Sequence, residues 1–521
     1  MAKKILVILS TITCYQLSYA GNVISKSFLT LRPRFEINLP ERLSLFRTRM
    51  DARKDGHKAA FEAVALYGQT SNQAAIARYF LPNGKDSIVI GEDASNSSVN
   101  RTRDVNAFHV GILTAPLDDT AIATGFIDLT FESTLNLCPQ QTLYGIGFAY
   151  QQRLPNHFWF DVAAPVIHVK NILGLTEHIA NVGGEDVPAG YFGCAISALG
   201  DCNADRHYGR MITKPLTKTR VAFIEARVGR DIRWENTCLI GGFGGIIIPT
   251  GNKPCGKYLF EPIVGNNGHF GVMIGSYGIF EVMRDSSDRT LSAQYNIVTR
   301  YLLANDQIRS FDLRGKPWSR YMRVWANDNN GLALAESEWQ SHLDYLINYS
   351  TLCVRVKTDA NIDLNANLNY KDRNFNIEAG YNAYARKAED IYFTHAIKSN
   401  IGLPALRWYL DGNTIPATES KATISTPLFK INPGYADQDI NPHGQESTTA
   451  MAYLPITTDD LDPDSGAHPA CLAYQVHGAI GYEWNECAYP TFINTGISYE
   501  FSYDNTFINR WLAWFKIGIS I

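Results

Sequence analysis

Two neighbouring segments of the chain alternate apolar and polar side chains without interruption. Residues 361–370, NIDLNANLNY, carry Asn or Asp at every odd position and an apolar residue at every even one. After a turn at 371–373, residues 375–386 repeat the pattern from Phe375 onward. Successive side chains of a strand point to opposite faces. The pattern therefore predicts a hairpin of two strands, each longer than the usual five or six residues and each with one apolar and one polar face.

The same alternation recurs at residues 144–151, 493–503 and 511–521. In a soluble sandwich the apolar face lies in a protein core, whereas in a transmembrane barrel it faces lipid and the polar face lines a wet lumen. Strands of about nine to eleven tilted residues cross a bilayer. Tyr and Trp suit its interfaces, and here they occur near strand ends, at Tyr370, Tyr499, Tyr503, Trp511 and Trp514. These features favour the barrel, with a secreted soluble β-protein as the alternative.

The composition fits a membrane barrel and excludes several other classes. Only 19% of the 521 residues are charged, below the roughly 25% of soluble globular chains. Disordered chains, coiled coils and nucleic-acid binders need a larger polar or basic surface, so no nucleic-acid partner is expected. Beyond residue 20 no stretch of about 18 apolar residues occurs, and the best candidate, 239–249, is broken by four glycines. The sequence therefore predicts no transmembrane helix.

The N-terminus has the features of a cleaved signal peptide. Lys3 and Lys4 precede an apolar run at 5–12, and Ser18 and Ala20 put small residues where a signal peptidase cuts. We therefore expect residues 1–20 to be a signal peptide and residues 21–521 to form a single domain outside the cytoplasm.

Two short motifs resemble Gram-negative outer-membrane barrels. The C-terminal sequence WFKIGISI is similar to the closing strand of such barrels, although it ends in Ile521 where they end in an aromatic residue. GGIIIPTGNKP, residues 244–254, resembles a strand that leaves the membrane at a PTG turn in porin-like barrels. The resemblance implies an all-β, antiparallel transmembrane barrel in outer-membrane lipid, inserted by the barrel-insertion machinery and open to small hydrophilic solutes, with a homo-oligomer as one option.

The alternation predicts about sixteen strands, within the known range of such barrels, with long extracellular loops at 387–402 and 432–471 and short periplasmic turns at 371–373, 411–419 and 485–490. One or two of the strands are expected near the N-terminus. The others are expected at 120–133, 141–152, 156–170, 216–229, 231–249, 268–283, 289–304, 308–325, 361–370, 374–386, 403–410, 420–431, 472–484, 491–504 and 510–521.

The segment 39–80 departs from the strand pattern. Residues 40–52 read as an amphipathic helix whose basic face includes Arg42, Arg47 and Arg49, and residues 71–80 as a second short helix. Inside the lumen, these arginines would form a constriction that favours anions. The other interpretation is a periplasmic or rim helix with a solvated basic face.

We expect a non-enzymatic channel with no cofactor and no metal site, because nucleophile, phosphate-binding and metal-ligand motifs are absent. An adhesion or binding protein acting through surface segments 172–210 and 432–471 is the main alternative, and an outer-membrane enzyme is another. Eight cysteines remain after residue 20, and Cys194 and Cys202 are the expected disulfide pair. The expected pore-lining residues are Asp363, Asn365, Asn367, Asn376, Glu378, Asn382, Arg386, Asn494, Glu500 and Lys516.

Overall fold

We describe the fold from a computed structural model of the chain. The structure describes residues 26, 50–52, 58–91, 103–112, 131–182, 187, 190–233, 237–287, 289–327, 343–397, 400–403, 408–410, 413–415, 454–502 and 504–521. The expected signal peptide and the constriction residues Arg42, Arg47 and Arg49 lie outside these ranges. No helix in the described part of the chain is long and apolar enough to cross a membrane.

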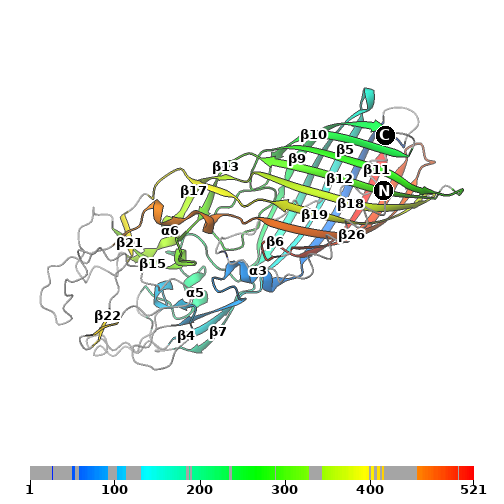
Figure 1. Ribbon diagram of the computed structural model, residues 1–521. Coiled ribbons are helices and arrows are strands. Elements are labelled where there is room, and N and C mark those ends of the chain that lie inside the picture. Colours follow the sequence, from blue (N-terminus) through cyan, green and yellow to red (C-terminus); the bar gives the residue numbers. More distant parts are fainter. Residues whose placement is uncertain are drawn as a thin grey trace.

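Twelve antiparallel strands form a closed barrel (Figure 1). They follow the order β5-β1-β28-β27-β26-β19-β18-β12-β11-β10-β9-β6, and β6 pairs back onto β5 to close the ring. Their bounds are Ala59–Thr70 (β1), Gln140–Arg153 (β5), Phe158–Ile172 (β6), Phe223–Arg233 (β9), Cys238–Pro249 (β10), Gly271–Arg284 (β11), Thr290–Leu302 (β12), Ala360–Asp372 (β18), Phe375–Arg386 (β19), Cys471–Trp484 (β26), Thr491–Ser502 (β27) and Arg510–Ser520 (β28).

The two faces of the barrel wall differ as the alternation predicts. On β27, Ile497 is 59% exposed on the outside, whereas Glu500 is 1% exposed on the inside. The exposed large apolar side chains on most barrel strands point outward in the same way, among them Phe148, Ile274 and Phe515. Because the ring is closed, every barrel strand is paired on both sides. A lipid environment requires this, since it offers no hydrogen bonds to a free strand edge. The predicted all-β antiparallel barrel is thus confirmed.

The barrel has fewer strands than the alternation suggested. β19 pairs directly with β26. The described residues of the predicted strand 403–410 belong to β21 (Asn400–Leu403) and β22 (Trp408–Leu410), which pair outside the ring, and the predicted strand 420–431 lies outside the described residues. The prediction at 308–325 is also wrong, because that segment forms several short elements beyond the barrel. The predicted strand 216–229 divides at Ala222 into β8 (Leu216–Val221), which pairs with β6 outside the ring, and β9. Most of the segment predicted at 120–133 lies outside the described residues, and its last two residues belong to β4 (Glu132–Asn136), which pairs outside the ring.

One barrel strand arises within the segment expected to be helical. Residues Ala59–Thr70 form β1, which pairs with β5 on one side and with the last strand, β28, on the other. The first and last strands of the barrel are therefore neighbours in the ring. The inward face of β1 carries Glu62, Val64 and Leu66, and Phe61 and Tyr67 lie outside. Alanines at 59, 60, 63 and 65 hide this alternation in the sequence, because alanine fits either face. The following helix α3, Gln73–Phe80, falls inside the predicted helical range 71–80.

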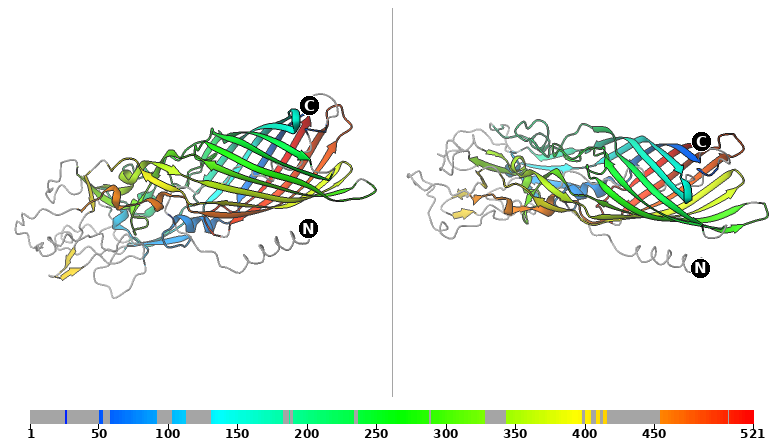
Figure 2. Two further views of the ribbon diagram at one scale, coloured as in Figure 1. Left: turned by 45° about the horizontal axis from the view of Figure 1, so that its top comes forward. Right: turned by 90° about the horizontal axis from the view of Figure 1, so that it is seen from above.

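At the end of the barrel where β28 finishes, the turns between strands are short, and they include those at 154–157, 373–374 and 485–490. The connections at the other end are mostly long. In outer-membrane barrels the short turns are periplasmic, so the long connections are assigned to the exterior. Figure 2 shows these connections gathered beyond one end of the barrel.

We call these packed connections the cap. Its core, which includes Phe80, Trp318 and Leu346, is separate from the barrel's own cluster of buried residues. The cap contains helices α3, α5 (Ala195–Leu199) and α6 (Leu346–Ser350), and strands β2 (Ser87–Gly91), β3 (Val105–Asn106), β4 (Glu132–Asn136), β7 (Thr176–Asn181), β13 (Asn305–Ser310), β14 (Asp312–Leu313), β15 (Arg323–Asn327), β16 (Leu343–Tyr345), β17 (Thr351–Lys357), β20 (Asp390–Phe393), β21 (Asn400–Leu403), β24 (Leu454–Pro455) and β25 (Leu461–Asp462). The hairpin β22 (Trp408–Leu410) and β23 (Asn413–Ile415) forms a small sheet of its own.

The outward face gives a direct test of membrane insertion. Replacing Ile497 with arginine is expected to destabilise the folded barrel in lipid vesicles by about 2–4 kcal/mol, the cost of a lipid-facing cation near the bilayer midplane. Denaturant unfolding of the vesicle-inserted protein measures this loss, with I497V as the matched apolar control. Equal stability of I497R and wild type would show that this face does not contact lipid.

Candidate functional site

The ten residues expected to line a pore all lie on the inward face of the barrel. Each is at most 7% exposed. Their arrangement follows from strand register, because Asn365 pairs with Asn382 and Asn494 pairs with Lys516 across neighbouring strands. Such low exposure shows that this conformation has no wide water-filled lumen around them. Their role in solute passage stays a prediction.

The charged side chains of the lumen are arranged in ion pairs. Arg227 binds Asp161, and Arg510 Nε lies 2.8 Å from Glu500 Oε2. Arg300 lies between two carboxylates, 3.3 Å from Asp363 and 3.7 Å from Glu225. Because a buried charge is costly unless it is paired, this pairing allows a polar interior inside a membrane. It also leaves most of the lumen's charges locally neutralised.

The sequence reading missed several of these groups. Asp161, Glu225, Arg227 and Arg300 are inward residues of predicted strands, and β9 shows the signal clearly, with Glu225, Arg227 and Asp231 at alternate positions. Glu62, which lies 3.5 Å from Lys516, was missed because β1 was assigned to the helical segment. One aromatic residue was also misplaced: Trp514 is 2% exposed, points inward and donates to Asn494 Oδ1 at 2.9 Å.

At the periplasmic end, residues that precede β1 contact the inner wall. Met50 is 2% exposed and belongs to the cluster of buried inward side chains, and Asp51 binds Arg153 through both carboxylate oxygens. Arg153 also binds Asp231, which accepts a hydrogen bond from Trp159 Nε1 at 3.1 Å. We call Met50–Ala52 and these partners the periplasmic lock, because they fasten a piece of chain to the inner wall at this end of the barrel.

At the opposite end, buried polar residues tie the cap to the strand ends. Glu389, just after β19, accepts from Arg309 Nη2 at 3.1 Å and contacts His468 Nδ1 at 2.9 Å, just before β26. Burial lowers the pKa of His468 to about 3, so this imidazole is neutral at physiological pH. These contacts join the cap strand β13, through Arg309, to the chain just beyond β19 and just before β26.

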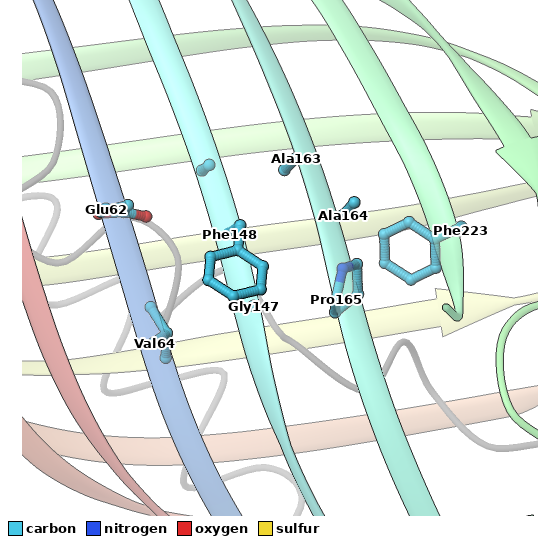
Figure 3. A pocket seen from close by; sticks show the side chains of 9 residues that line it. Glu62, Val64, Gly147, Phe148, Ala163, Ala164, Pro165 and Phe223 are labelled. Atoms are coloured by element: carbon cyan, nitrogen blue, oxygen red, sulfur yellow. The ribbon is translucent and has the colours of Figure 1, made fainter. Parts of the chain in front are cut away.

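Two small hollows lie on the inner wall. The first is bordered by β1, β5, β6 and β9, and its lining consists mainly of small or apolar residues such as Ala149, Ala163 and Pro165, with Glu62 as its charged member (Figure 3). Pro165 coincides with the point where β6 changes partner from β9 to β8. The second hollow is lined from β11, β12 and β18 by tyrosine, asparagine and glutamine residues, together with Gly278 and Ile279.

Other predicted features can be placed as follows. Cys194 and Cys202 are both free, and Cys194 Sγ lies 3.1 Å from Ser197 Oγ, so the expected disulfide is not formed in the structure. Within the described ranges, no group of three or more His, Cys, Asp or Glu side chains is arranged to hold a metal ion.

Comparison with known proteins gives a fold-level likeness only. No family model matches the chain, and no curated protein matches it. Among solved structures, an outer membrane channel from Pseudomonas putida F1 is 8% identical, with 90% of this chain and 98% of that chain covered and a TM-score of 0.33. A Pseudomonas aeruginosa FadL homologue is 7% identical, with 96% and 99% covered and a TM-score of 0.29.

The translocator domain of the autotransporter NalP from Neisseria meningitidis is 7% identical, with 92% and 94% covered and a TM-score of 0.30. These are Gram-negative outer-membrane barrels, the class that the closing strand and the PTG turn resemble. The similarities are too low to carry an argument about function. The class of this chain follows from its own strand pairing: it is a closed antiparallel barrel with an apolar outer face. Its inner face carries polar, charge-paired side chains beside a cluster of apolar ones.

Proposed function

We propose that the protein is an outer-membrane channel for passive movement of small hydrophilic solutes. The observation that carries this proposal is the polar part of the inner face, which follows β18 and β19 and continues with Glu500 and Lys516 on β27 and β28, inside an apolar outer face. Buried polar groups cost free energy unless they are hydrogen-bonded or paired, and part of this interior is packed with apolar side chains instead, so the polar part points to a role beyond packing. The proposed partners are outer-membrane lipid, the solutes themselves and the barrel-insertion machinery, with self-association as a further option.

Passage requires a rearrangement of the observed conformation. The inward side chains are nearly fully buried, the cap is tied to the strand ends, and the periplasmic lock occupies the other end. Opening therefore involves displacing Met50–Ala52 and loosening the cap, while the hydrogen-bonded barrel wall stays intact. Because most charges along the path are paired, we expect weak preference between cations and anions.

Single-channel recording tests this function. The full chain, purified from outer membranes and reconstituted in a planar bilayer, is expected to show stepwise ion conductance. A protein that fractionates with the outer membrane and folds as a barrel, yet never conducts, would refute the channel. Adhesion or binding through the cap would then be the better function, and a binding assay against host or cell-envelope extracts would follow.

A further inference from the structure

The second hollow brings uncharged hydrogen-bonding groups together inside the barrel. Asn296 of β12 pairs with Asn365 of β18, and Gln294 pairs with Asn367 one step further along. All four side chains point inward and line one cavity with Tyr277, and its empty space measures about 290 Å³, including the part open to solvent. The described residues that line it include no charged side chain. This sets the cavity apart from the ion-paired part of the lumen.

The amides of this cavity retain unused hydrogen-bonding capacity. Both Oδ1 and Nδ2 of Asn296 lack a hydrogen-bond partner among the described residues, as do Oδ1 of Asn365 and Oδ1 of Asn367. Each of these residues is at most 6% exposed. Buried polar groups in folded proteins are normally satisfied by protein, water or ligand. Four such atoms around one cavity therefore indicate a position that a hydrogen-bonding molecule occupies.

We propose that Asn296, Asn365 and Asn367 form a subsite for neutral polyhydroxylated solutes, meaning sugars and polyols. A hydroxyl both donates and accepts, as does a primary amide, so these groups match without any charge. Because the enclosed part of the cavity has room only for a water-sized group, one or two hydroxyls of the solute enter between the amides while the rest stays in the lumen. An ionic solute gains no counter-charge there.

The subsite deepens the proposed channel function and rests on it, since a solute reaches these residues only through the lumen. The subsite explains why amides cluster at a position in the lumen that charged side chains could also occupy. The weak, exchangeable bonds of amides let a solute leave as readily as it binds, whereas a bidentate ion pair would hold it.

Calorimetric titration of the detergent-solubilised full chain with glucose, glucitol and potassium gluconate tests the subsite. We expect weak, millimolar binding of glucose and glucitol, and little binding of gluconate, which carries the same hydroxyls beside a carboxylate. The substitutions N296A, N365A and N367A each remove an amide and enlarge the cavity. A loss of glucose binding in these variants therefore cannot result from steric blockage. The triple variant is expected to weaken glucose binding at least about tenfold.

Asn369→Ala is the matched control, because Asn369 is an inward asparagine of the same strand outside the cavity. Circular dichroism and heat-modified gel migration confirm that each variant folds. The subsite would be overturned if the triple variant and N369A bound glucose equally, or if gluconate bound more tightly than glucose. It would also be overturned if no solute gave heat, in which case the cavity holds ordered water only. Sugar binding without ion conductance would refute the channel alone, and conductance without sugar binding the subsite alone.

Discussion

Asp51→Asn is expected to raise the open fraction of the reconstituted channel about tenfold. Asp51 and Arg153 form a two-point charged hydrogen bond that holds Met50–Ala52 against the inner wall. A hydrogen bond to a charged group contributes about 1.5–3 kcal/mol, and the partial exposure of Asp51, 26%, reduces this value. A loss of about 1.4 kcal/mol shifts a two-state equilibrium tenfold. Single-channel open probability in a planar bilayer measures the change.

A second contact of Asp51 provides a control. Lys58 approaches Asp51 only to 4.0 Å and is 49% exposed, so Lys58→Gln is expected to leave the open probability unchanged. Because Arg153 keeps Asp231 as a partner in D51N, the variant leaves no unpaired buried cation and should fold normally. An open probability in D51N equal to that of wild type would show that the periplasmic lock does not limit conduction.

Asp312→Asn is expected to destabilise the cap by about 3–5 kcal/mol, the usual cost of removing one member of a buried ion pair. Arg320 is fully buried, and its Nε and Nη2 lie 2.9 Å and 3.0 Å from the two oxygens of Asp312. The backbone N–H of Arg320 donates to the same carboxylate at 3.0 Å. Asparagine cannot accept all three bonds or neutralise the guanidinium.

Limited proteolysis and thermal unfolding of the cap measure this effect, while heat-modified gel migration follows the barrel separately. The matched control is Asp306→Asn, which breaks the Arg355–Asp306 pair on neighbouring cap strands. That pair is about half exposed on both sides, so its loss should cost less than about 1 kcal/mol. If both variants unfolded at the same temperature, the Arg320–Asp312 pair would not be what stabilises the cap.

Strands whose two faces differ clearly were predictable from sequence. In β18 and β19 every inward residue except Gly380 and Tyr384 is Asn, Asp, Glu, Lys or Arg, so period-two alternation placed both their bounds and their orientation. On β27 and β28 alternation also placed the strands, although their inward face carries the apolar residues Phe492, Leu512 and Trp514 beside its polar ones. The ten candidate lumen residues came from these four strands. Their inward placement required only the rule that neighbouring side chains on a strand face opposite ways.

Contacts between distant segments determined the rest, because alternation does not specify a strand's partner. The chain itself determined that long strands have one apolar and one polar face, and their length and interface aromatics favoured a transmembrane barrel over a soluble sandwich. Only the tertiary structure determined that β1 closes the ring, that segments such as 308–325 enter a cap, and that Glu62 meets Lys516. These outcomes depend on which apolar surfaces pack together across hundreds of residues, and local pattern carries no record of that choice.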